Sequence, residues 1–267
     1  MPTYVIKRSG ARELFDEAKA RVAILRSGAT DQEADEILKR LGTELYDGIT
    51  TEVIYRHVHQ MLQGRKAIKF GLKKAILRLG PEGENFERFM ARVFEAEGYQ
   101  TTVRSTVPGK CVQHEVDIIL ENESERVMVE CKFHNSLGLK SNIQCTLYCF
   151  ARFLDLKATQ NFDLSCLATN TRFSSDAVQY ADCVGMRLLG WRHPEGAGLE
   201  QLVEKYSLYP ITILDMHRSD LGIFLSKHFL LARDVLDRKE ELQRLLPGPS
   251  VESLTSQVRE LLPETGH

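Results

Sequence analysis

The chain has 267 residues, 43% of them hydrophobic and 27% charged, and a formal net charge of −2 at pH 7. This composition is ordinary for a soluble globular protein, and it neither favours nor excludes a nucleic-acid partner. No apolar run has the length of a membrane span and the charged N-terminus shows no secretory signal, so we expect no membrane partner. The six cysteines form no C-x-x-C pair, which fits free thiols and a cytoplasmic location.

The first 80 residues predict one short strand or hairpin followed by about four helices. The strand begins the chain as TYVIKRSG, and apolar residues at three- and four-residue spacing then indicate the helices. Thr30 or Asp31 can cap the second helix, and Thr50 or Thr51 the third. The predicted helices cover residues 14–28, 30–45, 50–62 and 65–80.

The segment GPEGE at 80–84 is the best candidate for a domain boundary, because Gly, Pro and acidic residues gather there. The chain beyond it predicts the order α-β-β-β-α-β-α-β, which indicates a mixed α/β sheet flanked by helices. A helical tail over 219–262 follows, interrupted at 246–250. We therefore expect three domains, over residues 1–80, 81–215 and 216–267.

The apolar segments HEVDIIL (114–120) and ERVMVECKFH (125–134), separated by the polar turn ENESE, predict a hairpin, and Asp117, Glu130 and Lys132 lie inside its strands. Glu130 and Lys132, in the segment VECKFH, share one face of their strand, while Cys131 points to the other. Asp117 lies in the middle of the partner strand, HEVDIIL. Ionised side chains on a buried strand are costly unless they are paired or bound to a ligand. The pattern therefore indicates either a cross-strand ion pair or a site that binds a metal and a phosphate.

The spacing Asp-x12-Glu-x-Lys resembles the PD-(D/E)xK motif of restriction-endonuclease-like nucleases. This resemblance implies that Asp117 and Glu130, with the backbone carbonyl of Cys131, hold Mg²⁺ or Mn²⁺. The metal would polarise a phosphodiester and activate a bound water. Lys132 would orient that water or stabilise negative charge on the phosphate. Val116 stands where the motif's name has proline.

Two further stretches resemble the Mrr-like branch of these nucleases, whose members restrict modified DNA. The segment GENFERFMARVFEAEGY is similar to the opening helix of that branch, and its Glu87 matches a helical acid that supports the metal site. Residues 167–191 are similar to a downstream strand-helix-strand. The resemblance covers residues 81 to about 215 and implies a restriction-endonuclease-like fold.

Other polar residues near these motifs have weaker signals. Gln144 and Tyr148 resemble the Q-x-x-x-Y auxiliary motif of RecB-type nucleases, although polar residues four apart are common on a helix surface. His114 and His134 flank the acidic residues, where each could contact phosphate or simply pack.

The first module resembles an ATP-cone, a regulatory nucleotide-binding domain best known from ribonucleotide reductases. The matching stretches are VIKRSG with FDEAK and, later, YDGITTEVI, so nearly all of residues 3–80 is covered. The resemblance implies that Lys7, Arg8, Lys19 and Thr51 bind the phosphates of ATP or dATP. Tyr55 stands where reductase cones often have histidine.

Together these patterns predict a Mg²⁺-dependent DNA endonuclease that responds to ATP or dATP. Cones commonly act by changing subunit association, which implies a homo-oligomer. The absence of a Walker-type loop predicts nucleotide binding without hydrolysis. An alternative is a nucleotide-sensing regulator that binds DNA or a partner through a catalytically silent nuclease fold. A third interpretation, a reductase regulator, needs only the cone and leaves residues 81–215 unexplained.

Overall fold

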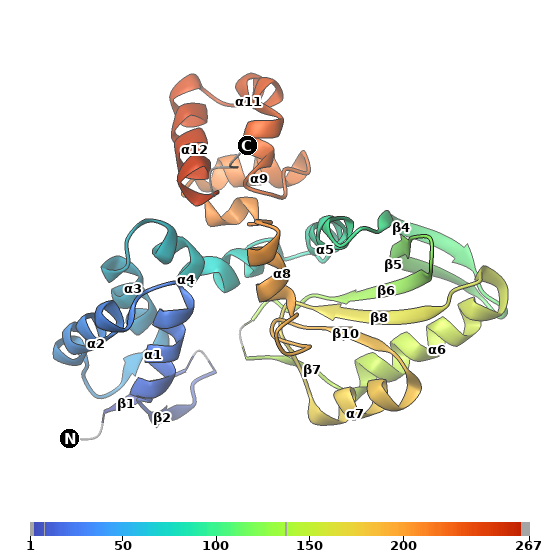
Figure 1. Cartoon of the computed structure of the whole chain (residues 1–267), viewed down its shortest axis with the longest axis horizontal. Helices are drawn as coiled ribbons and strands as arrows, with labels where there is room; N and C mark the ends of the chain where they lie inside the picture. Colours follow the sequence, from blue (N-terminus) through green and yellow to red (C-terminus); the bar gives the residue numbers. More distant parts are fainter. Residues whose placement is uncertain (1–2, 8, 137, 263–267) are drawn as a thin grey trace. The chain divides into compact units, whose positions relative to one another are not determined.

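The computed structural model describes residues 3–7, 9–136 and 138–262, and the chain divides into two compact units (Figure 1). One unit is formed by residues 1–73 and 256–267, and the other by residues 74–255. Among the described residues, no helix is long and apolar enough to cross a membrane.

The first unit combines a small sheet with helices, as the sequence predicts. Strand β1 (Tyr4–Ile6) pairs antiparallel with β2 (Arg12–Leu14) and parallel with β3 (Ile49–Thr50). Thr30 starts the second helix with a capping box, in which its side chain and that of Glu33 each accept from the other's backbone N–H. The helices are α1 (Glu17–Arg26), α2 (Asp31–Glu44), α3 (Thr51–Met61) and the larger part of α4 (Gly64–Leu77), whose last four residues belong to the second unit.

A five-stranded mixed sheet forms the centre of the second unit. Its strand order is β10-β8-β6-β5-β4, in which β4, β5 and β6 are antiparallel and β6, β8 and β10 are parallel. The predicted α-β-β-β-α-β-α-β order and the mixed α/β class are confirmed. The strands are β4 (Gln100–Pro108), β5 (Gln113–Glu121), β6 (Arg126–Lys132), β8 (Leu164–Thr169) and β10 (Arg187–Leu189).

Helices cover the sheet because apolar residues recur along one side of each. Helix α5 (Glu84–Ala96) packs on β4 and β5, while α6 (Ile143–Gln160) and α7 (Ser175–Val184) lie together along the other side of the sheet (Figure 1). Met128 and Phe153 belong to the buried cluster between sheet and helices. Two short strands, β7 (Lys140–Ser141) and β9 (Arg172–Phe173), pair parallel beside the main sheet.

The strands separate at the end of the sheet where β5 begins. The ladder between β5 and β6 runs from Glu121–Arg126 to Ile118–Val129 and ends there. On the other side of β5, the pairing with β4 skips Arg104, whose backbone is left-handed with φ 52°. Asp117 lies between these two interruptions, so its side chain is placed where the strands fork.

The remainder of the described chain is helical. Helix α8 (Leu199–Lys205), which the sequence did not predict, is followed by a 3-10 turn (Ile211–Ile213). The predicted helical tail comprises α9 (Arg218–Ser226), α10 (Asp234–Asp237), α11 (Lys239–Leu245) and α12 (Gly248–Leu261). Its interruption falls at Leu246 and Pro247, within the expected segment.

Candidate active site

Asp117 is held at the fork between β5 and β6. Because the β5–β6 ladder has ended, the backbone N–H of Cys131 is free to donate to Asp117 Oδ2, at 2.7 Å. Burial raises the pKa of Asp117 above its ordinary value, and the Cys131 hydrogen bond partly offsets the rise. The fork thus fixes one carboxylate and leaves its second oxygen available to a ligand.

Glu130 is the residue after Val129 and is bound by an arginine of helix α6. Arg152 Nη1 donates to Glu130 Oε2, and Arg152 Nη2 donates to the backbone carbonyl of Glu115 on β5. Burial raises the pKa of Glu130 to about 7, with the nearby Asp117 carboxylate adding to the rise and Arg152 opposing it.

Glu87 reaches the same region from helix α5, on the other side of β5. Its Oε2 atom is buried and accepts no hydrogen bond from the described residues, although Arg104 Nη1 lies 3.6 Å away. Arg104 also lies 3.1 Å from Glu115 and 3.5 Å from Glu84. Burial raises the pKa of Glu87 to about 7, and repulsion by Asp117 adds to the rise. A buried carboxylate oxygen without a donor is one that a cation or proton would satisfy.

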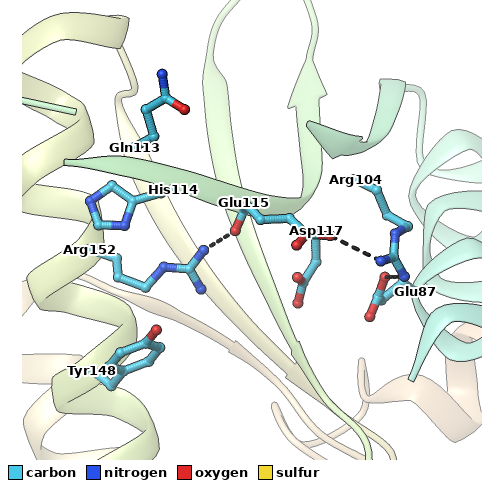
Figure 2. A pocket seen from close by; sticks show the side chains of 8 residues that line it. All are labelled: Glu87, Arg104, Gln113, His114, Glu115, Asp117, Tyr148 and Arg152. Carbon is cyan, nitrogen blue, oxygen red and sulfur yellow. Dashed lines mark hydrogen bonds and ion pairs between the residues drawn. The ribbon is translucent and has the colours of Figure 1, made fainter. Parts of the chain in front are cut away.

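Of these side chains, Asp117, Glu87, Arg104 and Arg152 line an open cavity of about 430 Å³, whereas Glu130 is not part of its lining. Figure 2 shows Asp117 in the middle, Glu87 and Arg104 on the α5 side, and Tyr148 and Arg152 on the α6 side. Gln113, His114 and Glu115 of β5 complete the lining. The cavity therefore joins carboxylates to two guanidinium groups, a combination suited to a metal ion and a phosphate.

The donor set fits a hard divalent cation. Asp117, Glu130 and Glu87 offer carboxylate oxygens, and burial raises the pKa of each; repulsion by Asp117 adds to the rise for both glutamates. Bound metal would relieve that repulsion. The carboxylates are not gathered tightly in the structure: within residues 3–7, 9–136 and 138–262, no group of three or more His, Cys, Asp or Glu side chains is placed to share one ion.

Of Lys132, Cys131, His114 and His134, which the sequence also places near the metal or phosphate, only His114 lines the cavity. Lys132 is exposed at the end of β6 and does not line the cavity. Cys131 presents its backbone to Asp117, and burial keeps the pKa of its thiol well above the usual range, so the thiol stays protonated. His114 does line the cavity, with its Nε2 2.8 Å from Asp155 Oδ2. His134 instead contacts the Ser141 hydroxyl at 3.0 Å.

The residues expected to bind nucleotide lie in the first unit. Lys7 forms an ion pair of 2.5 Å with Glu13, Lys19 is exposed on α1, and Arg8 lies outside the described residues. Thr50 is the cap of α3, since its side chain accepts from Val53 N–H, which leaves Thr51 exposed at the first helical position. Tyr55 stacks on Phe70 with ring centroids 5.1 Å apart, and burial raises its pKa to about 12.

Comparisons with known proteins match both parts of the chain. The family model described as restriction endonuclease matches residues 80–191, and that of the ATP cone domain matches residues 3–77. An uncharacterized protein of Archaeoglobus fulgidus is 41% identical over 155 residues, which are 58% of this chain and 88% of the relative. Residues 80–191 belong to the restriction-endonuclease family, and residues 3–77 before them form an ATP cone domain.

Two solved structures are similar to parts of this chain. A crystal structure of a protein of unknown function, AF1548, is 34% identical, with a TM-score of 0.60, and covers 67% of this chain and 98% of that one. The MspJI restriction endonuclease in complex with a 27-mer oligonucleotide covers 61% of this chain and 35% of that one. Its identity of 12% and TM-score of 0.39 are too low to support an argument.

Sequence reasoning missed two arginines of the restriction-endonuclease domain. Arg152 had a detectable signal, because Gln144, Tyr148 and Arg152 recur every four residues and therefore follow one face of α6. Arg104 had none, since a left-handed backbone at a non-glycine residue cannot be read from a strand pattern. Family membership supports a nuclease fold joined to a nucleotide-sensing domain.

Proposed function

We propose that the chain is a divalent-metal-dependent DNA endonuclease, regulated by ATP or dATP bound to the cone. The supporting observation is the fork at Asp117, where Asp117 of β5 and Glu87 of α5 line one cavity beside the partly buried Glu130 of β6. Burial, with the Asp117 charge adding to it, raises the pKa of both glutamates. Asp117 and Glu130, with the carbonyl of Cys131, would hold Mg²⁺ or Mn²⁺, and Glu87 would support the site. Within this proposal, the domains are residues 1–80, 81–215 and 216–267.

The bound metal would supply Lewis-acid activation of a water and of the phosphodiester. The protein's own contribution is to fix Asp117 through the Cys131 N–H and to exclude water partly from Glu87 and Glu130. Lys132 is exposed at the end of β6, outside the cavity lining, and from there its ammonium group would reach the charge that develops on phosphate. DNA is the proposed substrate, and the protein would act away from membranes.

The nucleotide site of the cone would use Lys7, Arg8, Lys19 and Thr51 for the triphosphate. Lys7 forms an ion pair with Glu13 in the structure, so a nucleotide phosphate would replace Glu13 as the partner of Lys7. Thr51 lies at the first position of α3, where free backbone N–H groups favour anions. Isothermal titration with ATP and dATP, on wild type and on Lys19→Ala and Thr51→Ala, tests this site.

A cleavage panel tests the enzyme. Wild type is incubated with supercoiled, branched and single-stranded DNA in Mg²⁺ or Mn²⁺, each with and without ATP and dATP. Asp117→Asn and Lys132→Ala should abolish cleavage, whereas Asp182→Asn, which neutralises an exposed carboxylate on α7, should not. Equal cleavage by wild type and both active-site variants would refute the proposed site. Gel filtration of wild type with each nucleotide tests whether the protein forms a nucleotide-dependent homo-oligomer.

One observation favours the second candidate, a nucleotide-sensing binding protein that cuts nothing. Arg152 already occupies Glu130, and Lys132 lies outside the cavity lining. In that case the protein would bind DNA or a partner without turnover under every metal and nucleotide condition. DNA binding without cleavage throughout the panel would support this candidate over the endonuclease.

A further inference from the structure

Arg152 has an unusual position for a buried guanidinium group. It is bound to the carboxylate of Glu130 and to the carbonyl of Glu115, which lie on two different strands. Its side chain is only 10% exposed, yet it lines the cavity beside Tyr148, whose ring centroid is 5.4 Å from the guanidinium carbon. Its Nε atom is buried and finds no acceptor among the described residues. The guanidinium group therefore donates to two acceptors while its Nε–H remains unsatisfied.

The Glu130 partner of Arg152 is also a proposed metal ligand. A guanidinium and a divalent cation on one carboxylate repel each other strongly at short range in a partly water-excluded site. Arg152 therefore balances the charge of Glu130 without metal, and a cation bound to Glu130 would compete with Arg152 for that carboxylate and weaken their ion pair. A guanidinium released beside the cavity would then seek another anion.

We propose that Arg152 is a metal-dependent phosphate clamp: it neutralises Glu130 while the metal site is vacant and exchanges that carboxylate for a backbone phosphate of the nucleic acid when a divalent cation binds. This inference rests on the proposed function, because it takes Glu130 as a metal ligand. It adds a residue that binds the substrate backbone and makes DNA binding at this cavity conditional on metal.

Arg152 is better suited to this exchange than the second arginine of the cavity. Arg104 lies within 3.6 Å of three glutamates, Glu84, Glu87 and Glu115, and only Glu87 of these is assigned near the metal. It therefore keeps carboxylate partners when the metal binds. Arg152 would lose Glu130, its carboxylate partner among the described residues, and its planar guanidinium matches two phosphate oxygens.

The first test measures metal binding directly, by the loss of free Mn²⁺ EPR signal during titration at pH 7.5. Arg152→Gln removes the competing charge from Glu130, so its Mn²⁺ affinity should rise about tenfold over wild type. Arg152→Lys keeps the charge but cannot reach Glu130 and the Glu115 carbonyl with two N–H groups, so its affinity should be intermediate. Lys157→Gln removes a cation from the same helix, where Lys157 contacts the Phe153 ring, and should not change it.

The second test measures binding of a fluorescent DNA duplex by anisotropy, once in Ca²⁺ and once in EDTA. Arg152→Gln should bind about tenfold more weakly than wild type in Ca²⁺ and equally well in EDTA, since the guanidinium is held by Glu130 when metal is absent. The DNA affinity of Lys157→Gln, relative to wild type, should be the same in Ca²⁺ as in EDTA. A damaged fold would weaken Mn²⁺ and DNA binding together.

The outcomes separate this inference from the proposed function. If Asp117→Asn loses Mn²⁺ binding while Arg152→Gln matches wild type, the clamp is refuted and the metal site stands. If Asp117→Asn binds Mn²⁺ as wild type does, or if no variant binds it, the metal site and the clamp both fail. Tighter Mn²⁺ binding together with a metal-dependent loss of DNA affinity in Arg152→Gln supports the clamp.

Discussion

The carboxylate of Asp117 accepts a hydrogen bond of 2.7 Å from the backbone N–H of Cys131 on the neighbouring strand. This side chain thus takes over a ladder hydrogen bond at the point where β5 and β6 separate. We expect Asp117→Asn, which retains the acceptor and removes a penalised buried charge, to be at least as stable as wild type at pH 7.5. Asp117→Ala leaves the N–H without its partner and should be about 1–2 kcal/mol less stable than Asp117→Asn.

Urea denaturation of the metal-free proteins measures this difference. Equal free energies of unfolding for the two variants would show that Asp117 does not support the strand fork.

The pH dependence of stability should reveal the buried carboxylate of Glu87. Its pKa is about 7 in the folded protein against an ordinary value of 4.5, so the folded state retains a proton that the unfolded state releases. This contribution to stability is complete below about pH 4.5 and is lost as the pH rises through 7. We therefore expect Glu87→Gln to gain about 1–3 kcal/mol over wild type at pH 8 and much less at pH 5.

Denaturation curves at the two pH values test the sign. Glu84→Gln is the matched control on the same helix, because a hydrogen bond from Arg88 lowers the pKa of Glu84 and its removal should bring no gain at pH 8. A gain for Glu87→Gln that is independent of pH would contradict the raised pKa.

The order of the elements was predictable because each carries its own periodic pattern and boundary residues. Helix α5 and strands β5 and β6 lie where apolar spacing predicts them, and the side chain of Ser174 caps α7. The pairs β1–β3 and β7–β9 were not predictable, because two-residue pairings carry no pattern of their own. They form only because the surrounding elements bring the segments together.

The candidate site was predictable only in part. The spacing Asp-x12-Glu-x-Lys is visible in the sequence, so Asp117 and Glu130 could be identified as candidate site residues. The alternation of side chains along a strand, however, does not predict the left-handed backbone of Arg104 or the end of the β5–β6 ladder at Ile118. The partners of the acids also come from distant segments, as Arg152 does, and long-range pairing of charges leaves no local trace.

Gly109 should be intolerant of a side chain. A Cβ atom there would lie 2.2 Å from Asp155 Oδ2 and 2.7 Å from the carbonyl of Val112, and Asp155 also accepts from Cys111 N–H. We expect Gly109→Ala to lower the free energy of unfolding by about 1–3 kcal/mol. Gly222→Ala, in an open position of helix α9, should instead raise it by about 0.5–1 kcal/mol.

Thermal unfolding followed by circular dichroism compares the two alanine variants. A Gly109→Ala protein as stable as wild type would mean that the loop between β4 and β5 relaxes away from Asp155 at little cost.

Thr50 and Thr51 should have separate roles at the start of α3. Thr50 provides the cap, with its hydroxyl 3.3 Å from Val53 N–H, so Thr50→Ala should destabilise the cone by about 0.5–2 kcal/mol. Thr51 is exposed, so Thr51→Ala should leave stability nearly unchanged while weakening ATP binding. Denaturation curves and ATP titrations of both variants measure these effects. A Thr51→Ala protein that lost stability and kept its ATP affinity would contradict these separate roles.

The left-handed residue at Arg104 also affects how the sheet ends. Strand β4 is an outer strand of the five, and a straight nine-residue margin would invite another polypeptide to add alongside it. The turn of the backbone at Arg104 divides that margin into two stretches of four residues each, Gln100–Val103 and Ser105–Pro108, which are short templates for intermolecular pairing. Arg104 therefore places its guanidinium group in the cavity, and its left-handed backbone discourages aggregation along β4.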